Sequence, residues 1–332
     1  MARKLADVAK QAGVSEATVS RVLNGRPGIS EATRAAVLTA LDVIGYERPT
    51  HLRVRRARMV GLIVPELQNP VFPALAEVVA GALAQRGFNA VLCTRTGSMS
   101  EAEYVEMLLE RQVSGMIFAG GQYAEADAPH EHYERLLKLR LPVVLINAAA
   151  EHLDFPRVST DDAVAMEQAY SHLADLGHER IGLILGPPDH VPSARKLAAF
   201  KRVAKVATPS EFVERTRFSL EGGHAAAGRL IERGATGIIC GSDPLALGAI
   251  RAARRANLSV PGDLSVVGFD DSAFMSCTNP PLTTVRQPLE AIGRAAVEML
   301  VGQIEGSPVS ADELFFEPEM VARGSTGNAP GH

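Results

Sequence analysis

The sequence predicts a small all-helical N-terminal module followed by a larger α/β body of two lobes, each built on a parallel sheet. Three observations predict this fold class. The chain has 332 residues, 46% of them apolar, which is enough for two or three domains with ordinary buried cores. Residues 1–45 carry apolar residues at helical spacing. From residue 59 onward, short apolar runs alternate with longer amphipathic stretches, the pattern of parallel strands covered by helices on both faces.

The first two helices of the module are short and are joined by a tight turn. Apolar residues recur at i, i+3, i+4 and i+7 over residues 5–12, and Gly13 is expected to end that helix. Ser15 is a favourable N-cap for the second helix, and Val14 and Val19 form a hydrophobic staple around it. Because the staple fixes the entry angle, the second helix should cross the first sharply.

A third helix is predicted between Ser30, which caps it, and Gly45, which lies past its end. Three short helices with a tight turn between the first two form the helix-turn-helix arrangement, which lays its second helix in the major groove of DNA. Charge supports this use, because residues 1–60 hold 11 Lys and Arg against 5 Asp and Glu, whereas the rest of the chain holds 23 against 33. We therefore expect only the module to meet double-stranded DNA.

The outward face of the second helix is small and polar. Arg21 can donate two hydrogen bonds to a guanine edge, whereas Ala17 offers methyl contact and Glu16 can accept from cytosine. Short hydroxyl and amide groups beside them suit phosphate oxygens. The residues of the module expected at the DNA are Leu5, Ser15, Glu16, Ala17, Thr18, Ser20, Arg21 and Asn24.

Residues 5–46, LADVAKQAGVSEATVSRVLNGRPGISEATRAAVLTALDVIGY, resemble the N-terminal signature of the LacI/GalR family of bacterial transcription regulators. The resemblance implies a DNA-binding head attached to a periplasmic-binding-protein-like (type I) body that senses a small molecule, commonly a sugar. One position departs from the pattern: Lys4 stands where the family usually places a Thr or Ser cap, so the first helix should fray more.

An arginine-rich linker, ERPTHLRVRRARMV, follows over residues 47–60. In the family, the equivalent stretch is a hinge helix that enters the minor groove with a leucine wedge. The usual Asn-x-x-Ala-Arg-x-Leu pattern is missing here, so two interpretations stay open. Leu52 is the candidate wedge; alternatively Arg53, Arg55 and neighbouring arginines enter a narrowed groove or contact phosphate.

Two successive sets of strand and helix signals in the body imply two lobes that hold a ligand at the carboxyl ends of their strands. No strand is assigned between Lys205 and Gly222, where the segment is short. Helices are expected at 71–86, 101–111, 131–140, 193–205, 243–256 and 289–305, the last of which returns to the first lobe. The predicted domains are a helix-turn-helix domain at 1–47, a linker at 48–59 and a body at 60–332, with a first lobe of about 60–158 and 289–307 and a second of about 159–288 and 308–332.

Several classes of protein are excluded by what the sequence lacks. It contains no nucleotide-binding glycine pattern, no G-x-S-x-G elbow and no histidine cluster at metal spacing, so we expect no enzyme, no catalytic residue, no cofactor and no metal. No run approaches about 18 apolar residues, and the N-terminus lacks the apolar region of a secretory signal. We therefore expect a cytoplasmic protein without a membrane partner, in which Cys93, Cys240 and Cys277 are reduced core thiols.

The resemblance also implies ligand-binding positions in the body. Asp270, in VVGFDD, is the expected acceptor of ligand hydroxyls, and Phe72 is the expected stacking ring. Lys196 stands where the family usually has an arginine, so either Arg195 beside it has taken over or the hydroxyl geometry differs. The full predicted set is Asn69, Phe72, Asn147, Arg195, Lys196, Ser242 and Asp270.

Phrases such as EGGHAAAGRLI and NPPLTTVRQP resemble actinobacterial maltose-type regulators and point to a malto-oligosaccharide or related glucoside. The expected protein is a homodimeric repressor, because one short head offers few base contacts. Two alternatives stay open. The ligand can be a corepressor such as a purine, or the chain can be a solute-binding protein, which would need an export signal and no DNA-binding head.

Overall fold

The protein is described here by a computed structural model covering residues 5–23, 28–44, 58–95, 99–147, 152–204 and 212–331. It divides into two compact units, Met1–Arg58 and Met59–His332. The division falls at the end of the predicted linker, and each unit has its own apolar core.

The first unit consists of three helices, α1 (Leu5–Ala12), α2 (Glu16–Leu23) and α3 (Glu31–Ile44). Gly13, with a φ of +66°, ends α1 in the left-handed region that favours glycine. The predicted caps are present: Ser15 Oγ accepts from Thr18 N at 3.2 Å, and Ser30 Oγ accepts from Thr33 N at 3.2 Å. The core between the helices contains Val8, Ala9, Val19, Val22, Val37, Ala40 and Leu41.

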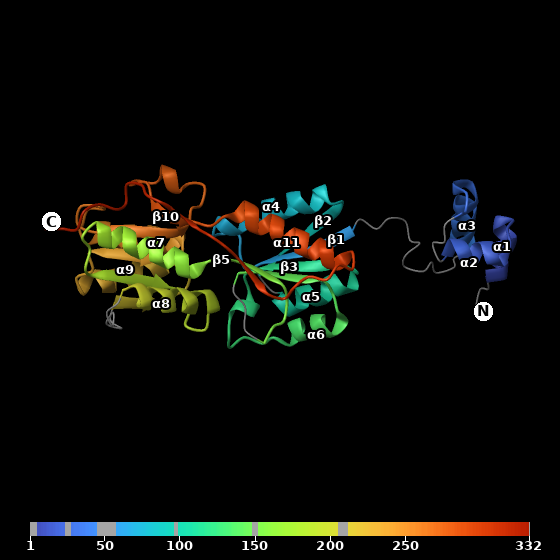
Figure 1. Cartoon of the computed structure of the whole chain (residues 1–332), viewed down its shortest axis with the longest axis horizontal. Helices are drawn as coiled ribbons and strands as arrows, with labels where there is room; N and C mark the ends of the chain where they lie inside the picture. The colour runs from blue at the N-terminus through green and yellow to red at the C-terminus, as the bar shows by residue number, and fades with distance from the viewer. Residues whose placement is uncertain are drawn as a thin grey trace. The chain divides into compact units, whose positions relative to one another are not determined.

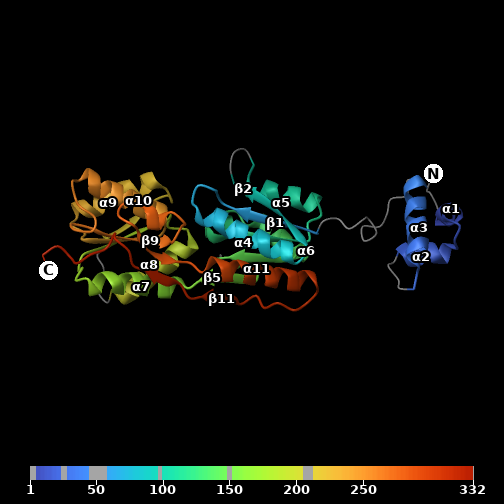
Figure 2. The ribbon, with the colours of Figure 1, turned by 90° about the horizontal axis from the view of Figure 1, so that it is seen from above.

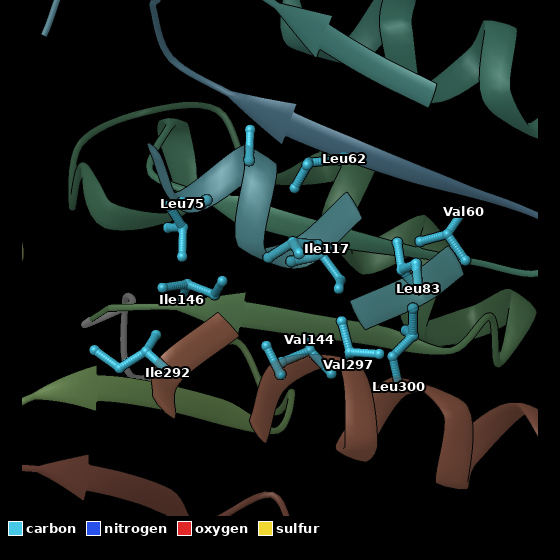
Figure 3. Packing of buried hydrophobic residues seen from close by; sticks show 14 of the residues in the cluster. Val60, Leu62, Leu75, Leu83, Ile117, Val144, Ile146, Ile292, Val297 and Leu300 are labelled. Atoms are coloured by element: carbon cyan, nitrogen blue, oxygen red, sulfur yellow. The ribbon is translucent and has the colours of Figure 1, made fainter. Parts of the chain in front are cut away.

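A six-stranded sheet with the strand order β11-β5-β4-β3-β1-β2 forms the first lobe of the second unit. Helices α4 and α11 cover one face, and α5 and α6 cover the other (Figure 1). Apolar side chains from α4, α11 and the sheet, among them Leu75, Ile117 and Leu300, pack together between these two helices and the sheet (Figure 3). The elements are β1 (Arg58–Val64), α4 (Val71–Gln85), β2 (Phe88–Thr94), α5 (Glu101–Glu110), β3 (Gly115–Ala119), η1 (Gln122–Ala124), α6 (Glu131–Leu139), β4 (Val143–Ile146), β5 (Arg157–Thr160), α11 (Leu289–Ile304) and β11 (Glu313–Phe316).

The second lobe repeats this arrangement with the strand order β12-β10-β9-β8-β6-β7, in which only the pairing of β12 with β10 is antiparallel. Helices α9 and α10 cover one face, and α7 and α8 cover the other (Figure 2). The elements are α7 (Asp162–Asp175), β6 (Ile181–Leu185), α8 (Val191–Val203), β7 (Val213–Arg215), α9 (Leu220–Glu232), β8 (Gly237–Cys240), α10 (Asp243–Arg255), β9 (Ser265–Asp270), η3 (Met275–Cys277), β10 (Thr283–Arg286) and β12 (Glu319–Val321).

Strand pairing corrects two sequence-based expectations. Residues 308–316 were expected in the second lobe, but β11 pairs in parallel with β5, Glu313 opposite Arg157, at the edge of the first sheet. The segment left without a strand contains β7, which pairs with β6. The chain therefore crosses between the lobes three times: after β5, before α11 and after β11.

All three cysteines are free, but only Cys93 and Cys240 are buried; Cys277 is exposed, so the expectation of a core thiol is wrong there. Within the described residues, no group of three or more His, Cys, Asp or Glu side chains is placed to hold a metal ion. None of the helices in the described ranges is long and apolar enough to cross a membrane.

Candidate functional site

The outward face of α2 carries the predicted base-reading residues. Glu16, Ala17 and Arg21 are exposed, whereas Val19 and Val22 on the opposite face are completely buried. Helical periodicity thus separates the face that packs in the core from the exposed face. Thr18 and Ser20 are half-buried beside them; the hydroxyl of Ser15 lies 2.9 Å from that of Thr18. Asn24, Leu52, Arg53, Arg55 and the side chain of Leu5 lie outside the described residues.

A chain of buried and half-buried hydrogen bonds joins the two lobes at the carboxyl ends of their strands. Asp270, the last residue of β9, accepts from Gln287 Nε2 at 2.7 Å through Oδ1 and from Asn69 Nδ2 at 3.4 Å through Oδ2. Gln287 lies where the chain crosses back to the first lobe, and its Oε1 accepts from Thr160 Oγ1 at 2.7 Å. Asn69 precedes α4 in the first lobe. Through Gln287, Asp270 is also linked to the crossing before α11 and to the crossing after β5, where Thr160 lies.

Lys196 on α8 lies in a buried ion pair beside this chain. Its ammonium group donates to Asp162 Oδ1 at the start of α7 and lies 4.1 Å from the centre of the Phe269 ring. Lys196 is only 6% exposed and Asp162 9%, so each charge depends on the other for compensation. The ring adds a cation–π contact.

The buried carboxyl groups of this region hold their protons more tightly than usual. Burial, followed by the charge of Asp243, raises the pKa of Asp270 to about 8, against the opposing hydrogen bonds from Gln287 and Asn69. Burial likewise raises the pKa of Asp243 to about 6, although Ser272 N and Thr284 Oγ1 donate to it. Acid groups with raised pKa values gather at functional sites.

From the raised pKa of Asp270 we expect the free energy of unfolding to fall as pH rises. The folded protein keeps this proton up to about pH 8, whereas the unfolded chain releases it near the ordinary value of 3.8. The stabilisation is therefore complete below about pH 4 and is lost as pH rises through the folded pKa. Urea unfolding at a series of pH values should show a shallower decline for Asp270→Asn than for the native chain; parallel curves would mean that Asp270 titrates normally.

Phe72, Asn147 and Ser242, also predicted, make contacts within their own lobes. Phe72 is half-buried against the core of the first lobe, and a Cβ atom at Gly120 would lie 3.2 Å from its ring. Asn147 follows β4 with a φ of +76°, and its backbone N–H donates to Val158 O at 2.7 Å. Ser242 is buried, and its hydroxyl caps α10 by accepting from Leu245 N at 3.5 Å.

Arg195 points to a partner in the other lobe. Its guanidinium donates from Nη1 and Nη2 to the two carboxylate oxygens of Glu313 in β11, at 2.6 and 2.8 Å. Lys196 therefore occupies the buried cluster, and Arg195 makes a bidentate ion pair with the first lobe.

Three residues of this region were not predicted. Asp162 pairs with Lys196, Gln287 bonds to Asp270, and His190 caps α8 by accepting from Ser193 N at 3.3 Å through Nδ1. Burial, and then the charges of Lys196 and Arg215, lower the pKa of His190 to about 3, so its ring is neutral. Gln287 and His190 lie in no sequence pattern that reveals their partners.

Comparisons with known proteins agree with both parts of this description. Residues 4–49 match the family model of bacterial regulatory proteins, lacI family, and residues 170–326 match the periplasmic binding protein-like domain. The chain is 51% identical over 339 residues to the HTH-type transcriptional regulator MalR of Streptomyces coelicolor, covering 100% of this chain and 98% of that protein. It is 50% identical over 340 residues to the regulator reg1 of Streptomyces lividans, covering 100% and 99%.

Two solved structures are similar over nearly the whole chain. The transcriptional regulator CelR in complex with cellobiose has a TM-score of 0.73 and 31% identity, covering 97% of this chain and 99% of that one. The lac repressor dimer bound to operator and the anti-inducer ONPF has a TM-score of 0.73 and 26% identity, covering 98% and 99%. Because full-length relatives share half of its residues and the family model matches its helix-turn-helix module, this chain belongs to the lacI family of bacterial regulatory proteins.

Proposed function

We propose that this chain is a cytoplasmic, homodimeric repressor whose affinity for operator DNA is controlled by a sugar of the maltose or malto-oligosaccharide class. The observation that carries the ligand part is the buried hydrogen bond from Asn69 to Asp270, which joins the two lobes at the carboxyl ends of their strands. A carboxylate accepts two vicinal hydroxyl hydrogens and an amide both donates and accepts, which is how proteins recognise sugars. The names of MalR and of the CelR–cellobiose complex support a sugar ligand.

In this proposal the ligand replaces contacts that the protein makes with itself. Asp270 accepts ligand hydroxyls in place of the Asn69 amide, and the Phe72 ring covers the C–H face of the sugar. Lys196 supplies a donor while it remains paired with Asp162. Asn147 and Ser242 are further proposed contacts, from the first and the second lobe respectively.

Isothermal titration calorimetry with maltose, malto-oligosaccharides, trehalose and nucleobases tests the ligand class. Saturable binding of a glucoside, with a negative heat-capacity change from buried apolar surface, is the expected result. Binding of a nucleobase and of no sugar would replace the sugar by a purine-type corepressor. A body that binds none of these compounds would contradict the proposed class of ligand.

The DNA part of the proposal assigns base recognition to α2. Two heads of a dimer would read a near-palindromic operator, and dimerisation supplies the specificity that one short head lacks. The lac repressor dimer bound to operator, a structural relative, supports this arrangement. The arginine-rich linker, whose residues 47–57 lie outside the described residues, is proposed to contact the minor groove or the backbone.

Replacing Arg21 with Ala should weaken binding to the operator by roughly 1 to 3 kcal/mol and leave non-specific binding largely unchanged, because a bidentate contact to guanine is lost. Fluorescence polarisation with operator and scrambled duplexes measures both affinities at one salt concentration. Arg34→Ala, on α3, is the matched control and should keep the preference for the operator. Equal weakening of Arg21→Ala on all duplexes would reassign Arg21 to phosphate contact.

A further inference from the structure

An ion pair joins the two lobes beside the proposed ligand site. Arg195 lies on α8, which packs in the core of the second lobe, and Glu313 begins β11, the edge strand of the first sheet. Both carboxylate oxygens of Glu313 accept from the guanidinium, and Ser159 Oγ in β5 donates to Oε1 at 2.6 Å. The side chain of Glu313 is 11% exposed and that of Arg195 33%, so this pair is better shielded from water than an ordinary surface pair.

The surroundings favour the charged form of this pair. Burial alone would raise the pKa of Glu313, but the hydrogen bonds from Arg195 and Ser159 outweigh it and hold the pKa below its ordinary value. The guanidinium also lies 5.9 Å from the centre of the Phe315 ring, two residues along the same strand. Because the planar guanidinium donates two hydrogen bonds to one carboxylate, the pair fixes the orientation of α8 relative to β11 as well as their distance.

Arg195 and Lys196 are neighbours on one helix, and they face different partners. Lys196 contacts Asp162 and Phe269 in the second lobe, whereas Arg195 contacts the first lobe. A shift of α8 relative to β11 would therefore move Lys196 and, at the same time, break the ion pair between Arg195 and Glu313. A second contact between the lobes lies just before α8, where Ala126 N donates to Asp189 O at 2.8 Å.

We propose that Arg195 is a positioning residue that acts through Glu313: their ion pair ties α8 to the edge strand of the first lobe and so sets the separation of the lobes at which the ligand is bound. Arg195 then contacts no ligand atom. This inference rests on the proposed function for its regulatory meaning, but the tie itself is an ion pair of the protein chain alone. The proposal therefore assigns Arg195 to the interface between the lobes and not to the ligand.

Hydrogen–deuterium exchange of the full chain without ligand tests the tie directly. In Glu313→Gln, the amide of Ala126, which reports contact between the lobes, should exchange about tenfold faster than in the native chain. The matched control is Glu214→Gln, whose carboxylate pairs with Arg229 and Arg233 inside the second lobe and which should leave Ala126 unchanged. The exchanged pair Arg195→Glu with Glu313→Arg should restore slow exchange, although Glu313→Gln alone does not.

Equal exchange of Ala126 in Glu313→Gln and the native chain, with the fold intact by circular dichroism, would overturn the proposal. A calorimetric titration with maltose adds the regulatory part: Glu313→Gln should bind about tenfold more weakly, whereas Arg195→Lys should bind more tightly than Arg195→Ala because a cation remains. If maltose fails to bind the native chain, the proposed sugar is wrong, whereas the exchange of Ala126 still decides whether the tie exists.

Discussion

Replacing Lys196 with Met is expected to lower the free energy of unfolding by about 3 to 5 kcal/mol, the cost of leaving a buried charge without its partner. Asp162, 9% exposed, would lose the ammonium group that compensates it. Burial already raises the pKa of Asp162, and Lys196 is the strongest opposing influence. The loss should therefore be larger at pH 8 than at pH 5, where the stranded carboxylate can take up a proton instead.

Urea unfolding of the ligand-free protein measures this change. The double variant Asp162→Asn with Lys196→Met removes both charges and should recover most of the lost stability, since no uncompensated charge remains. Arg294 provides a control, because its side chain is 57% exposed and its pair with Glu290 lies in water; Arg294→Met should cost far less. Additive losses from Asp162→Asn and Lys196→Met would show that the two side chains do not depend on each other.

Replacing Asp270 with Ala is expected to weaken ligand binding by about 100-fold or more, because a site built to accept hydroxyl hydrogens is left without its acceptor and with buried polar groups unpaired. The Asn69 amide and the Gln287 amide both lose their partner in this variant. Operator binding without ligand should stay within about twofold of the native value, since α2 belongs to the other compact unit.

Titration of the variant with the ligand, in the presence and absence of operator, separates these two effects. Asp271→Asn is the matched control, because this neighbouring carboxylate pairs with Arg286 and Arg323 and not with Asn69 or Gln287. A normal ligand response in Asp270→Ala would place the ligand elsewhere. Loss of operator binding without ligand would instead mean that Asp270 supports the whole fold.

Local signals in the sequence predicted the helices and their caps. Ser15 and Ser30 precede apolar periodicity and cap α2 and α3 as expected, because capping depends only on residues three positions apart. β7 and β11 were not predicted, since strands of three and four residues at the edges of sheets carry no clear periodicity. The assignment of β11 to the first lobe depends on its pairing with β5, which no local pattern encodes.

The site could be predicted only in part for the same reason. The resemblance of VVGFDD to the family pattern implied Asp270, and in the structure Asp270 ends β9, at the edge to which parallel strands bring their carboxyl ends. The sequence left open whether Arg195 or Lys196 enters the cluster, since adjacent helical residues face directions about 100° apart. The structure separates them through their partners, Asp162 and Glu313, which lie 34 and 118 positions away in the chain.

The central claim is that occupation of the body changes the affinity of the head for operator DNA, and its most direct test is an operator titration with and without saturating ligand. Fluorescence polarisation of a labelled operator, first with maltose and then with each compound that calorimetry shows to bind, gives both the size and the sign of the effect. The account predicts a change in the operator dissociation constant of about tenfold, within the usual range of coupling between two sites. Identical operator affinity in the presence and absence of every bound compound would contradict it.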